Sequence, residues 1–323
     1  MILAGIDIGG TKCRLSLGDV TAGGVEFLHK GVAHATADCT PDQMLNLLLG
    51  DFNKAAEKLS EKPAAIGISC GGPLDQKRGI ILSPPNLPDW DAIHVTEFFT
   101  RHTGIPAFLQ NDADAGALAE WQYGAGKGCK TIIFITFGTG CGSGLILDNR
   151  LYSGASGCAG EIGHVRIAEY GPPGYGKLGS MEGYCSGGGI ARLSRFMVEA
   201  ELQKGRHPAF CPAYADLDSL SAKTVGIAAE QGDPLALKIY SEVGKKLGAG
   251  LAILIDILNP EMIILGSIFK RSRNELWPDA QAIIEQETLP LARAACKVVP
   301  AALGEEIGDY AAIAVAEYGR NRQ

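Results

Sequence analysis

Two short glycine-rich turns are the segments of this sequence best suited to binding a phosphate. The first, Gly9-Gly10-Thr11-Lys12, lies in AGIDIGGTKCRLSLG, and the second, Gly138-Thr139-Gly140, lies in ITFGTGCGSGLI. Each interrupts apolar, β-prone residues, where glycine weakens a strand. Glycine lets backbone N–H groups converge on an anion, and threonine hydroxyls add further donors. Either turn alone is equally well explained as a tight hairpin, but the matching pair favours two sites holding one polyphosphate.

Two better-known phosphate motifs are not supported. The stretch GTGCGSG lacks the spacing of GxGxxG, and GAGKGCKT at 124–131 has Cys129 where a Walker A motif needs glycine. The second stretch also precedes its strand instead of following it. The sequence therefore predicts neither Rossmann nor P-loop nucleotide binding.

Two aspartates near these turns are candidates for chemistry. Asp7 is the only acid of the first hairpin, and because strands disfavour aspartate, we expect it to act on nucleotide-bound Mg²⁺ and not merely to contact solvent. Asp112 ends a buried strand and begins a helix, so a role as the N-cap of that helix would be enough to explain it. Beside a bound triphosphate, however, it is well placed to accept a proton from a hydroxyl that attacks the γ-phosphate.

Polar residues also gather in a glycine-rich stretch from Gly154 to Gly189. Glu161 and His164 stand three apart in GASGCAGEIGHVRI, and Glu182 follows in MEGYCSGGG. Such acceptors among small residues suit a polyhydroxylated ligand. A buried histidine that satisfies its own hydrogen bonds is the simpler explanation of His164.

The first part of the chain alternates strands and helices. The patterns predict a hairpin from residues 2–8 and 13–17 and a helix at 41–59, and together the segments up to Gly124 follow the order βββαββαβα. Thr40-Pro41 marks the start of the helix. The sequence thus predicts a first α/β lobe that carries Asp7 and Asp112.

The second part repeats this strand, turn and strand at 131–152. Helices are expected at 190–203, 234–258 and in the tail DYAAIAVAEYG, and a buried strand at 261–267. A period-3.6 stripe supports the helix at 234–258, formed by Leu235, Ile239, Val243, Leu247, Leu251, Leu254 and Leu258. We therefore expect two similar α/β lobes.

Length and composition agree with a two-lobed protein that binds a small molecule. A chain of 323 residues exceeds the usual size of one core. Its net charge of −7 and the lack of a basic run give no footprint for nucleic acid or an anionic membrane. Nine cysteines, never fewer than 12 positions apart, suggest reduced thiols. With no signal peptide or membrane span in the pattern, we expect a cytoplasmic protein.

Together these motifs resemble the ROK family of sugar kinases and sugar-responsive repressors. The resemblance covers nearly the whole chain and rests on segments in matching order and spacing: DIGGTK at 7–12, PNLPDW at 85–90, NDADAGALAE at 111–120, TFGTGCGSG at 136–144, GEIGH at 160–164 and LNPEMIILGS at 258–267. It implies the two-domain actin-like ATPase (ribonuclease H-like) α/β fold of hexokinases. ATP and Mg²⁺ are the implied cofactors, and a homodimer is the implied assembly.

The resemblance also implies roles for matching residues. Asp112 would be the general base. The sugar would be held by Gly72, Asn86, Asn111, Asp112, Glu161, His164 and Glu182. ATP and its phosphates would be held by Asp7, Gly9, Gly10, Thr11, Lys12, Gly138, Thr139, Gly140, Gly266 and Ser267. Ser267 stands where the family often has glycine, a mild change near the adenosine.

One departure from the family pattern concerns a metal. The family commonly follows GEIGH with CxCGxxGCxE, whose thiolates and histidine form a zinc site. Here Pro173, Tyr175 and Ser180 stand at the three cysteine positions. We therefore expect no structural zinc, and a loop held by packing that includes Tyr175. His164 would then keep only its contact with the sugar.

We expect an ATP-dependent carbohydrate kinase that phosphorylates a hexose such as glucose or fructose at its 6-OH. An N-acetylhexosamine (GlcNAc or ManNAc) kinase and a non-catalytic sugar-sensing regulator are the alternatives, and inorganic polyphosphate could replace ATP. Only six residues precede Asp7, which leaves no room for the repressors' DNA-binding domain. We expect an N-terminal lobe at 1–112 plus 303–323, with the first phosphate hairpin and Asp112, and a C-terminal lobe at 113–302, with the second hairpin, the GEIGH segment and the adenosine pocket.

Overall fold

Two main β-sheets organise the computed structural model, which describes residues 1–322. The chain divides into two units: unit 1 comprises Met1–Phe134, Gly144–Ala159 and the residues from Ala302 onward, and unit 2 comprises Ile135–Ser143 and Gly160–Ala301. These units differ from the expected lobes, because residues 113–134 and 144–159 group with unit 1.

The first sheet lies in unit 1 and has the strand order β3-β2-β1-β5-β8, with the short β4 pairing with β2. Its strands are β1 (Ile2–Ile8), β2 (Lys12–Thr21), β3 (Gly24–Lys30), β4 (His34–Ala35), β5 (Ile66–Cys70) and β8 (Ala107–Asn111). The expected hairpin is present, since β1 and β2 are antiparallel, whereas β1, β5 and β8 run parallel. Two short strands, β6 (Leu74–Asp75) and β7 (Ile80–Ile81), pair separately.

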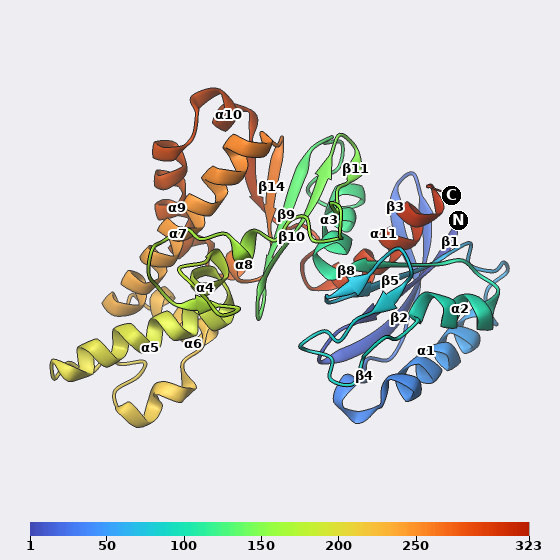
Figure 1. Ribbon diagram of the computed structural model, residues 1–323, viewed down its shortest axis with the longest axis horizontal. Coiled ribbons are helices and arrows are strands. Elements are labelled where there is room, and N and C mark those ends of the chain that lie inside the picture. The colour runs from blue at the N-terminus through green and yellow to red at the C-terminus, as the bar shows by residue number, and fades with distance from the viewer. Residues whose placement is uncertain (323) are drawn as a thin grey trace. The chain divides into compact units, whose positions relative to one another are not determined.

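Helices cover both faces of this sheet. Figure 1 shows α1 (Pro41–Ala56) and α2 (Val95–Thr103) on one side and α11 (Ile307–Arg320) on the other, with α3 (Asp112–Gln122) beside α11. A capping box at Thr40 starts α1 as the sequence predicts. Successive strand residues point to opposite faces, so Ile6 packs towards α1 and α2 while Leu3 packs against Ile313 of α11.

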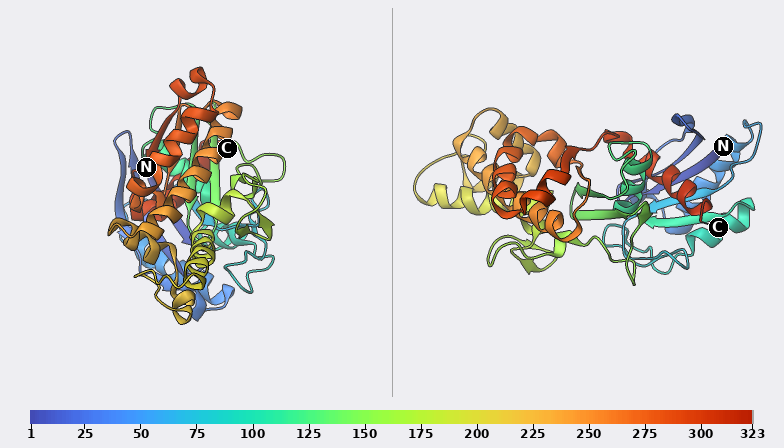
Figure 2. Two further views of the ribbon diagram at one scale, coloured as in Figure 1. Left: turned by 90° about the vertical axis from the view of Figure 1, so that its left-hand side faces the viewer. Right: turned by 90° about the horizontal axis from the view of Figure 1, so that it is seen from above.

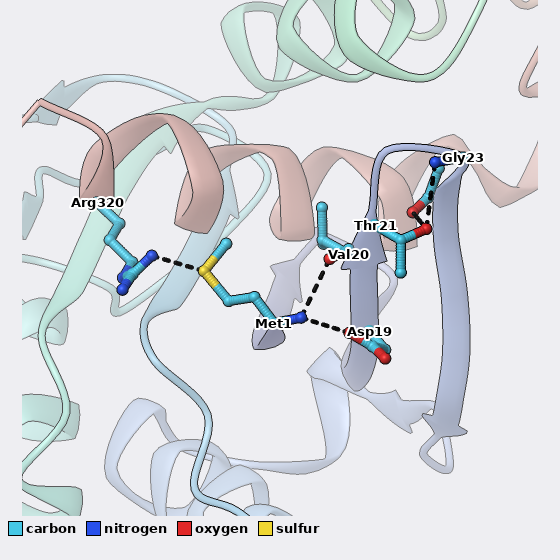
Figure 3. Close-up of polar contacts among 7 residues, drawn as sticks. Met1, Asp19, Val20, Thr21, Gly23 and Arg320 are labelled. Atoms are coloured by element: carbon cyan, nitrogen blue, oxygen red, sulfur yellow. Dashed lines mark hydrogen bonds and ion pairs between the residues drawn. The ribbon is translucent and has the colours of Figure 1, made fainter.

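The approach of α11 to the sheet is unusually close. A Cβ on Gly67 of β5 would lie 2.0 Å from the carbonyl oxygen of Ala312. Only glycine fits at this position of the strand. Figure 3 shows two hydrogen bonds at the start of unit 1, in which the amino group of Met1 donates to Asp19 Oδ1 at 2.6 Å and to Val20 O at 3.1 Å. The first strand of unit 1, β1, thus belongs to the same sheet on which its last helix, α11, packs.

The second sheet has the order β11-β10-β9-β14-β15, and the boundaries between the units fall within β9 and β10. Its strands are β9 (Ile132–Phe137), β10 (Cys141–Leu147), β11 (Arg150–Leu151), β14 (Met262–Leu265) and β15 (Lys297–Pro300). The strand expected at 261–267 is therefore present but shorter. A separate small hairpin pairs β12 (Pro173–Gly174) with β13 (Lys177–Leu178).

Unit 2 also contains a group of helices. They are α4 (Met181–Cys185), α5 (Gly187–Gln203), α6 (Ala222–Glu230), α7 (Pro234–Leu258), α8 (Ile268–Arg271), α9 (Arg273–Glu287) and α10 (Pro290–Ala295). Figures 1 and 2 show α7 and α9 side by side. The expected apolar stripe of α7 is buried from Ile239 to Leu254 and half-buried at its two ends.

Short 3₁₀ helices complete the structure: η1 (Thr36–Asp38), η2 (Ile162–His164), η3 (Tyr214–Ser219) and η4 (Gly304–Glu306). All nine cysteines are free thiols. Within residues 1–322, no helix has the length and apolar character needed to cross a membrane.

Candidate active site

The candidate site of unit 1 lies where three parallel strands end. The register aligns Ile8 of β1 with Cys70 of β5, and Cys70 with Asn111 of β8. Each strand is followed at once by site residues: Gly9-Gly10, Gly71-Gly72 and Asp112. Ligands of α/β sheets bind at the carboxyl ends of the strands. The fold thus brings three predicted segments to one edge of the sheet.

The first glycine turn is a tight, exposed bend with a fixed base. Gly9 N donates to Lys12 O at 3.0 Å, and Thr36 Oγ1 donates to Gly9 O at 2.6 Å. A Cβ on Gly10 would lie 2.6 Å from the carbonyl oxygen of Asn86, so Asn86 approaches the turn directly. Buried Leu87 and Trp90 anchor the segment that carries it. Asn86 therefore lies beside the first glycine turn.

Asp112 is the first residue of α3, and its neighbour Asn111 is the N-cap. Asn111 Oδ1 accepts a hydrogen bond from Ala113 N at 3.0 Å, while Asp112 Oδ1 accepts from the same N–H at 2.8 Å. Gly72 approaches Asn111 closely, since a Cβ there would lie 3.1 Å from Asn111 Nδ2. Asp112 is exposed, yet desolvation by the surrounding protein raises the pKa of its carboxyl group. The capping role belongs to Asn111, which leaves Asp112 Oδ2 available to a ligand.

Asp7 points to the face of the sheet that α11 covers. A Cβ on Gly308, in the first turn of α11, would lie 2.7 Å from Asp7 Oδ2. Burial, followed by the charges of Asp112 and Asp309, raises the pKa of Asp7 to about 6. Carboxylate oxygens are the ligands that a hard cation such as Mg²⁺ prefers, so the chemistry of the Asp7 side chain is compatible with the role expected from the sequence.

The second glycine turn connects β9 and β10 in unit 2. Gly138 N donates to Gly140 O at 3.0 Å, and Gly138 O accepts from Gly187 N at 2.9 Å. Gly187 is the first residue of α5, so the N-terminus of a 17-residue helix abuts the turn. Helix N-termini favour anions. This part of the site was missed by the sequence analysis, although SGGG before an apolar helical pattern is a usable signal.

Both glutamates predicted to bind sugar lie near the start of β10. Cys141 N donates to Glu182 Oε2 at 3.1 Å, and Ser143 Oγ donates to Gly160 O at 2.5 Å, beside Glu161. Burial, then Cys185, then Glu182 and Glu161 raise the pKa of the Cys141 thiol well above its usual value. Unit 2 thus gathers the two carboxylates at the end of the glycine turn.

The Gly266-Ser267 turn lies beside the same strands. Gly266 N donates to Ile135 O at 2.8 Å, and the hydroxyls of Thr136 and Ser267 are 3.2 Å apart. Ser267 has φ 51° and ψ −112°, which is strained for a residue with a Cβ. The Gly→Ser change is therefore not the mild one expected from sequence.

A cavity of about 470 Å³ follows this turn in unit 2. Its lining comes from α6, α7, α8 and the start of α9: Ala222, Lys223, Gly226, Ile227, Glu230, Tyr240, Ile268, Arg271 and Ser272. Tyr240 is buried and donates its hydroxyl proton to Ala222 O at 2.9 Å. The size and mixed lining suit a nucleoside.

The residues at the family's zinc positions do not fit a zinc ion. Pro173 has no donor atom in its side chain, and the Tyr175 side chain is 76% exposed. Ser180 Oγ already accepts a hydrogen bond from Gly183 N at 3.1 Å. Across residues 1–322, no cluster of three or more His, Cys, Asp or Glu side chains could hold a metal ion.

The predicted residues thus form two sets, one in each unit. Unit 1 brings together Asp7, Gly9, Gly10, Thr11, Lys12, Gly72, Asn86, Asn111 and Asp112. Unit 2 holds Gly138, Thr139, Gly140, Glu161, His164, Glu182, Gly266 and Ser267.

Comparison with known proteins points to one family. The family model described as "ROK family" matches residues 3–317. A glucokinase of Streptomyces coelicolor is 32% identical over 265 residues, which cover 81% of this chain and 80% of the relative. The solved ROK hexokinase of Thermus thermophilus has a TM-score of 0.82 at 26% identity, with both chains fully covered.

A ROK family glucokinase of Streptomyces griseus, solved in complex with glucose and AMPPNP, has a TM-score of 0.74 at 29% identity. The match covers 98% of this chain and 99% of that chain. A xylose repressor of Caldicellulosiruptor bescii and the DNA-binding transcriptional repressor Mlc of Escherichia coli also match, at 28 and 29% identity. Similarity by itself therefore does not separate a kinase from a regulator, and the distinction depends on the site residues.

Proposed function

The chain belongs to the ROK family, and from this premise we propose that it transfers the γ-phosphoryl group of ATP to the 6-OH of a hexose such as glucose or fructose. One observation carries the proposal. Three parallel strands of unit 1 end together and bring the glycine turn, Asn86 and the Asp112 carboxyl group to one edge of the sheet. A protein that only senses a sugar has no use for a phosphate-binding turn beside these sugar ligands.

Asp112 is the proposed general base. Its Oδ1 is bound to Ala113 N, which fixes the carboxylate while Oδ2 accepts the proton of the sugar hydroxyl. Desolvation raises the pKa of this group, and a higher pKa makes a carboxylate a stronger base. In a loose phosphoryl-transfer transition state, positioning and electrostatics contribute more than proton removal. Asp112 therefore both orients and deprotonates the acceptor.

The phosphates are the proposed ligands of the two glycine turns. In unit 1 the proposed phosphate ligands are the backbone N–H groups of Gly10 and Thr11, with Lys12. In unit 2 they are Gly138-Thr139-Gly140 and the N-terminus of α5. Bound Mg²⁺ supplies positive charge to the phosphates, and Asp7 would hold it through water. The cavity beside Gly266-Ser267 is the proposed adenosine site.

The proposed sugar ligands divide between the units in the same way. Gly72, Asn86, Asn111 and Asp112 would contribute from unit 1, and Glu161, His164 and Glu182 from unit 2. Glu182 Oε2 is taken by Cys141 N, so Oε1 is the atom that would accept from a sugar hydroxyl.

The Asp112→Asn variant tests this proposal. Because Asn cannot accept the proton, we expect kcat to fall by about 10²-fold or more, with the sugar KM changed much less. ADP release coupled to sugar addition measures both parameters. Asp218→Asn, at an exposed surface carboxylate, is the matched control and should keep the wild-type rate. Near-normal turnover by Asp112→Asn would refute the assignment.

A sugar panel then identifies the acceptor. Glucose, fructose, N-acetylglucosamine and N-acetylmannosamine are each offered with ATP or with inorganic polyphosphate. A neutral hexose with ATP should give the highest kcat/KM. Turnover confined to an acetamido sugar would support the N-acetylhexosamine kinase, whereas sugar binding without any phosphorylation would support the non-catalytic regulator.

A further inference from the structure

The hairpin of β12 and β13 lies against His164 in unit 2. Its register pairs Pro173 with Leu178 and Gly174 with Lys177. The two connecting residues, Tyr175 and Gly176, have φ of 46° and 76°. Positive φ at both central residues is the mark of a type I′ turn, which favours Asn, Asp or Gly at its first position. Tyrosine there is strained, so a compensating contact is expected.

That contact is with the imidazole of His164. The rings of Tyr175 and His164 meet edge to face, with centroids 5.2 Å apart and an interplanar angle of 82°. Edge-to-face pairs are an attractive geometry for aromatic rings. Because the rest of the Tyr175 side chain is largely exposed, the ring contact with His164 is the interaction that offsets the backbone strain at Tyr175.

A second contact fixes the backbone of His164. Lys177 Nζ donates to His164 O at 2.6 Å. His164 is the last residue of η2, and the carbonyl groups at the end of a helix carry partial negative charge and lack partners within it. Lys177 therefore supplies a hydrogen-bond donor to the carbonyl group of the residue whose ring Tyr175 contacts.

Two backbone hydrogen bonds hold the ends of this segment together. Ile167 N donates to Gly179 O at 2.9 Å, and Met181 N donates to Val165 O at 2.9 Å. Within residues 1–322, neither ring nitrogen of His164 has a hydrogen-bond partner in the protein. Both nitrogens are thus available to a ligand.

We propose that Lys177 and Tyr175 are positioning residues that hold His164 ready for the sugar, a role that a zinc ion would fill in relatives with cysteines at 173, 175 and 180. Lys177 fixes the backbone, and Tyr175 fixes the ring. This inference rests on the proposed sugar contact of His164. It predicts that sugar affinity depends on two side chains that need not touch the sugar, and that no metal is required.

Four variants test the inference. Lys177→Met removes the charge and keeps the length, and Tyr175→Ala removes the ring. Both should weaken sugar binding by on the order of tenfold, while the KM for ATP stays within about twofold. Tyr175→Phe, which keeps the ring, and Lys177→Arg, which keeps the charge, are the matched controls and should retain sugar affinity. Calorimetry gives the sugar Kd without turnover. Unchanged affinity in both Lys177→Met and Tyr175→Ala would overturn the inference.

Metal content gives an independent measurement. The purified wild-type protein should contain no stoichiometric zinc, and EDTA should leave its Tm unchanged. Stoichiometric zinc, or a fall in Tm on chelation, would contradict a metal-free loop.

The failure of the proposed function can be told apart from the failure of this inference. If the wild type neither binds nor phosphorylates any sugar, the proposed function is wrong. The positioning role is then judged from the NMR signals of the His164 ring. These signals should shift or broaden in Lys177→Met and Tyr175→Ala but not in the two controls. Unchanged ring signals would refute the positioning role.

Discussion

The surroundings of the Asp7 carboxyl group disfavour its negatively charged form. It lies against the first turn of α11, and burial together with the nearby charges of Asp112 and Asp309 raises its pKa to about 6. A divalent cation relieves this repulsion. The same arrangement makes the stability of the ligand-free protein sensitive to pH.

This sensitivity gives a prediction for stability. Since the pKa of Asp7 is higher in the folded state than the ordinary value of 3.8, the folded protein binds the proton more tightly. Protonation of Asp7 thus stabilises the folded state, and this stabilisation is fully present below pH 3.8 and is lost as pH rises through about 6. As the pH rises from 4 to 7, the free energy of unfolding of Asp7→Asn should therefore increase relative to that of the wild type by on the order of 2 kcal/mol. Urea unfolding of the ligand-free proteins measures the difference, and parallel pH profiles would contradict it.

Ser267 carries a second prediction at the scale of a residue. Its φ of 51° is strained, and Ser267→Gly removes the strain while it increases the entropy of the unfolded chain. We expect a net gain of about 1 kcal/mol in the free energy of unfolding. Ser60→Gly is the control: Ser60 is exposed and has no positive φ, so it should lose stability. A loss in Ser267→Gly would show that the hydroxyl contact with Thr136 outweighs the strain.

Some residues of the candidate site can be identified from the sequence, and others cannot. Asp112 stands out because an acid follows a buried strand, but the sequence does not reveal that Asn111 takes over the capping bond. His164 stands out by its spacing from Glu161, whereas Lys177 reaches it only through the hairpin at 173–178. Local patterns identify chemistry-bearing residues, and the contacts between distant segments depend on the fold.

At the scale of elements, the packing of α11 on the first sheet connects stability to the site. The helix lies directly on Gly67, and its first turn contacts Asp7. Any displacement of α11 therefore changes the environment of Asp7.

Gly67→Ala tests this connection. Its Cβ would lie 2.0 Å from Ala312 O, so the helix must move, at a cost of about 1–3 kcal/mol or more. Activity should fall at temperatures where the variant is still folded. Gly50→Ala in α1 is the matched control, because a Cβ there meets nothing within 4 Å and alanine favours a helix by about 1 kcal/mol. Thermal unfolding and kcat at 25 °C measure both effects. A stable, fully active Gly67→Ala would contradict the close packing.

The elements themselves differ in how well the sequence predicts them. The β1–β2 hairpin, α1 and α7 follow from alternation, a capping signal and an apolar stripe. No comparable signal marks α9, because Pro278 lies inside it and argues against a helix. The placement of the α5 N-terminus against Gly138 is a contact between distant segments, which periodicity does not encode.

At the scale of the whole molecule, the chain passes between the two units four times: at 134/135, 143/144, 159/160 and 301/302. The last passage is anchored in unit 1 by Glu120, which is fully buried. Its Oε2 accepts from Ala125 N at 2.8 Å and Ala302 N at 3.2 Å, and its Oε1 accepts from Leu303 N at 3.0 Å.

Glu120→Ala should therefore be strongly destabilising. Three backbone N–H groups would lose their acceptor, and each buried donor left unpaired costs about 1–3 kcal/mol. Hydrogen exchange should accelerate at Ala302 and Leu303 before the rest of unit 1. Glu199→Gln, at a surface ion pair with Arg195, is the control and should change stability by less than about 0.5 kcal/mol. Unchanged exchange at Ala302 and Leu303 would refute the anchoring role.

The fold class predicted from the sequence is confirmed by the ROK hexokinase and glucokinase structures that superpose on this chain. The resemblance to the family is likewise confirmed by the match over residues 3–317. The expected homodimer stays a prediction, to be checked by light scattering. What sequence patterns could not supply are the unit boundaries, because these depend on which distant segments pack together.

The position of α11 also has a consequence for synthesis on the ribosome. Its residues cover the side of the first sheet on which Leu3 and Ala65 are buried, yet they are translated after the whole of unit 2. A nascent chain therefore carries an uncovered apolar surface for on the order of ten seconds of elongation. Chaperones that recognise such surfaces should associate with ribosome-bound chains throughout this interval and leave once residues 302–320 emerge.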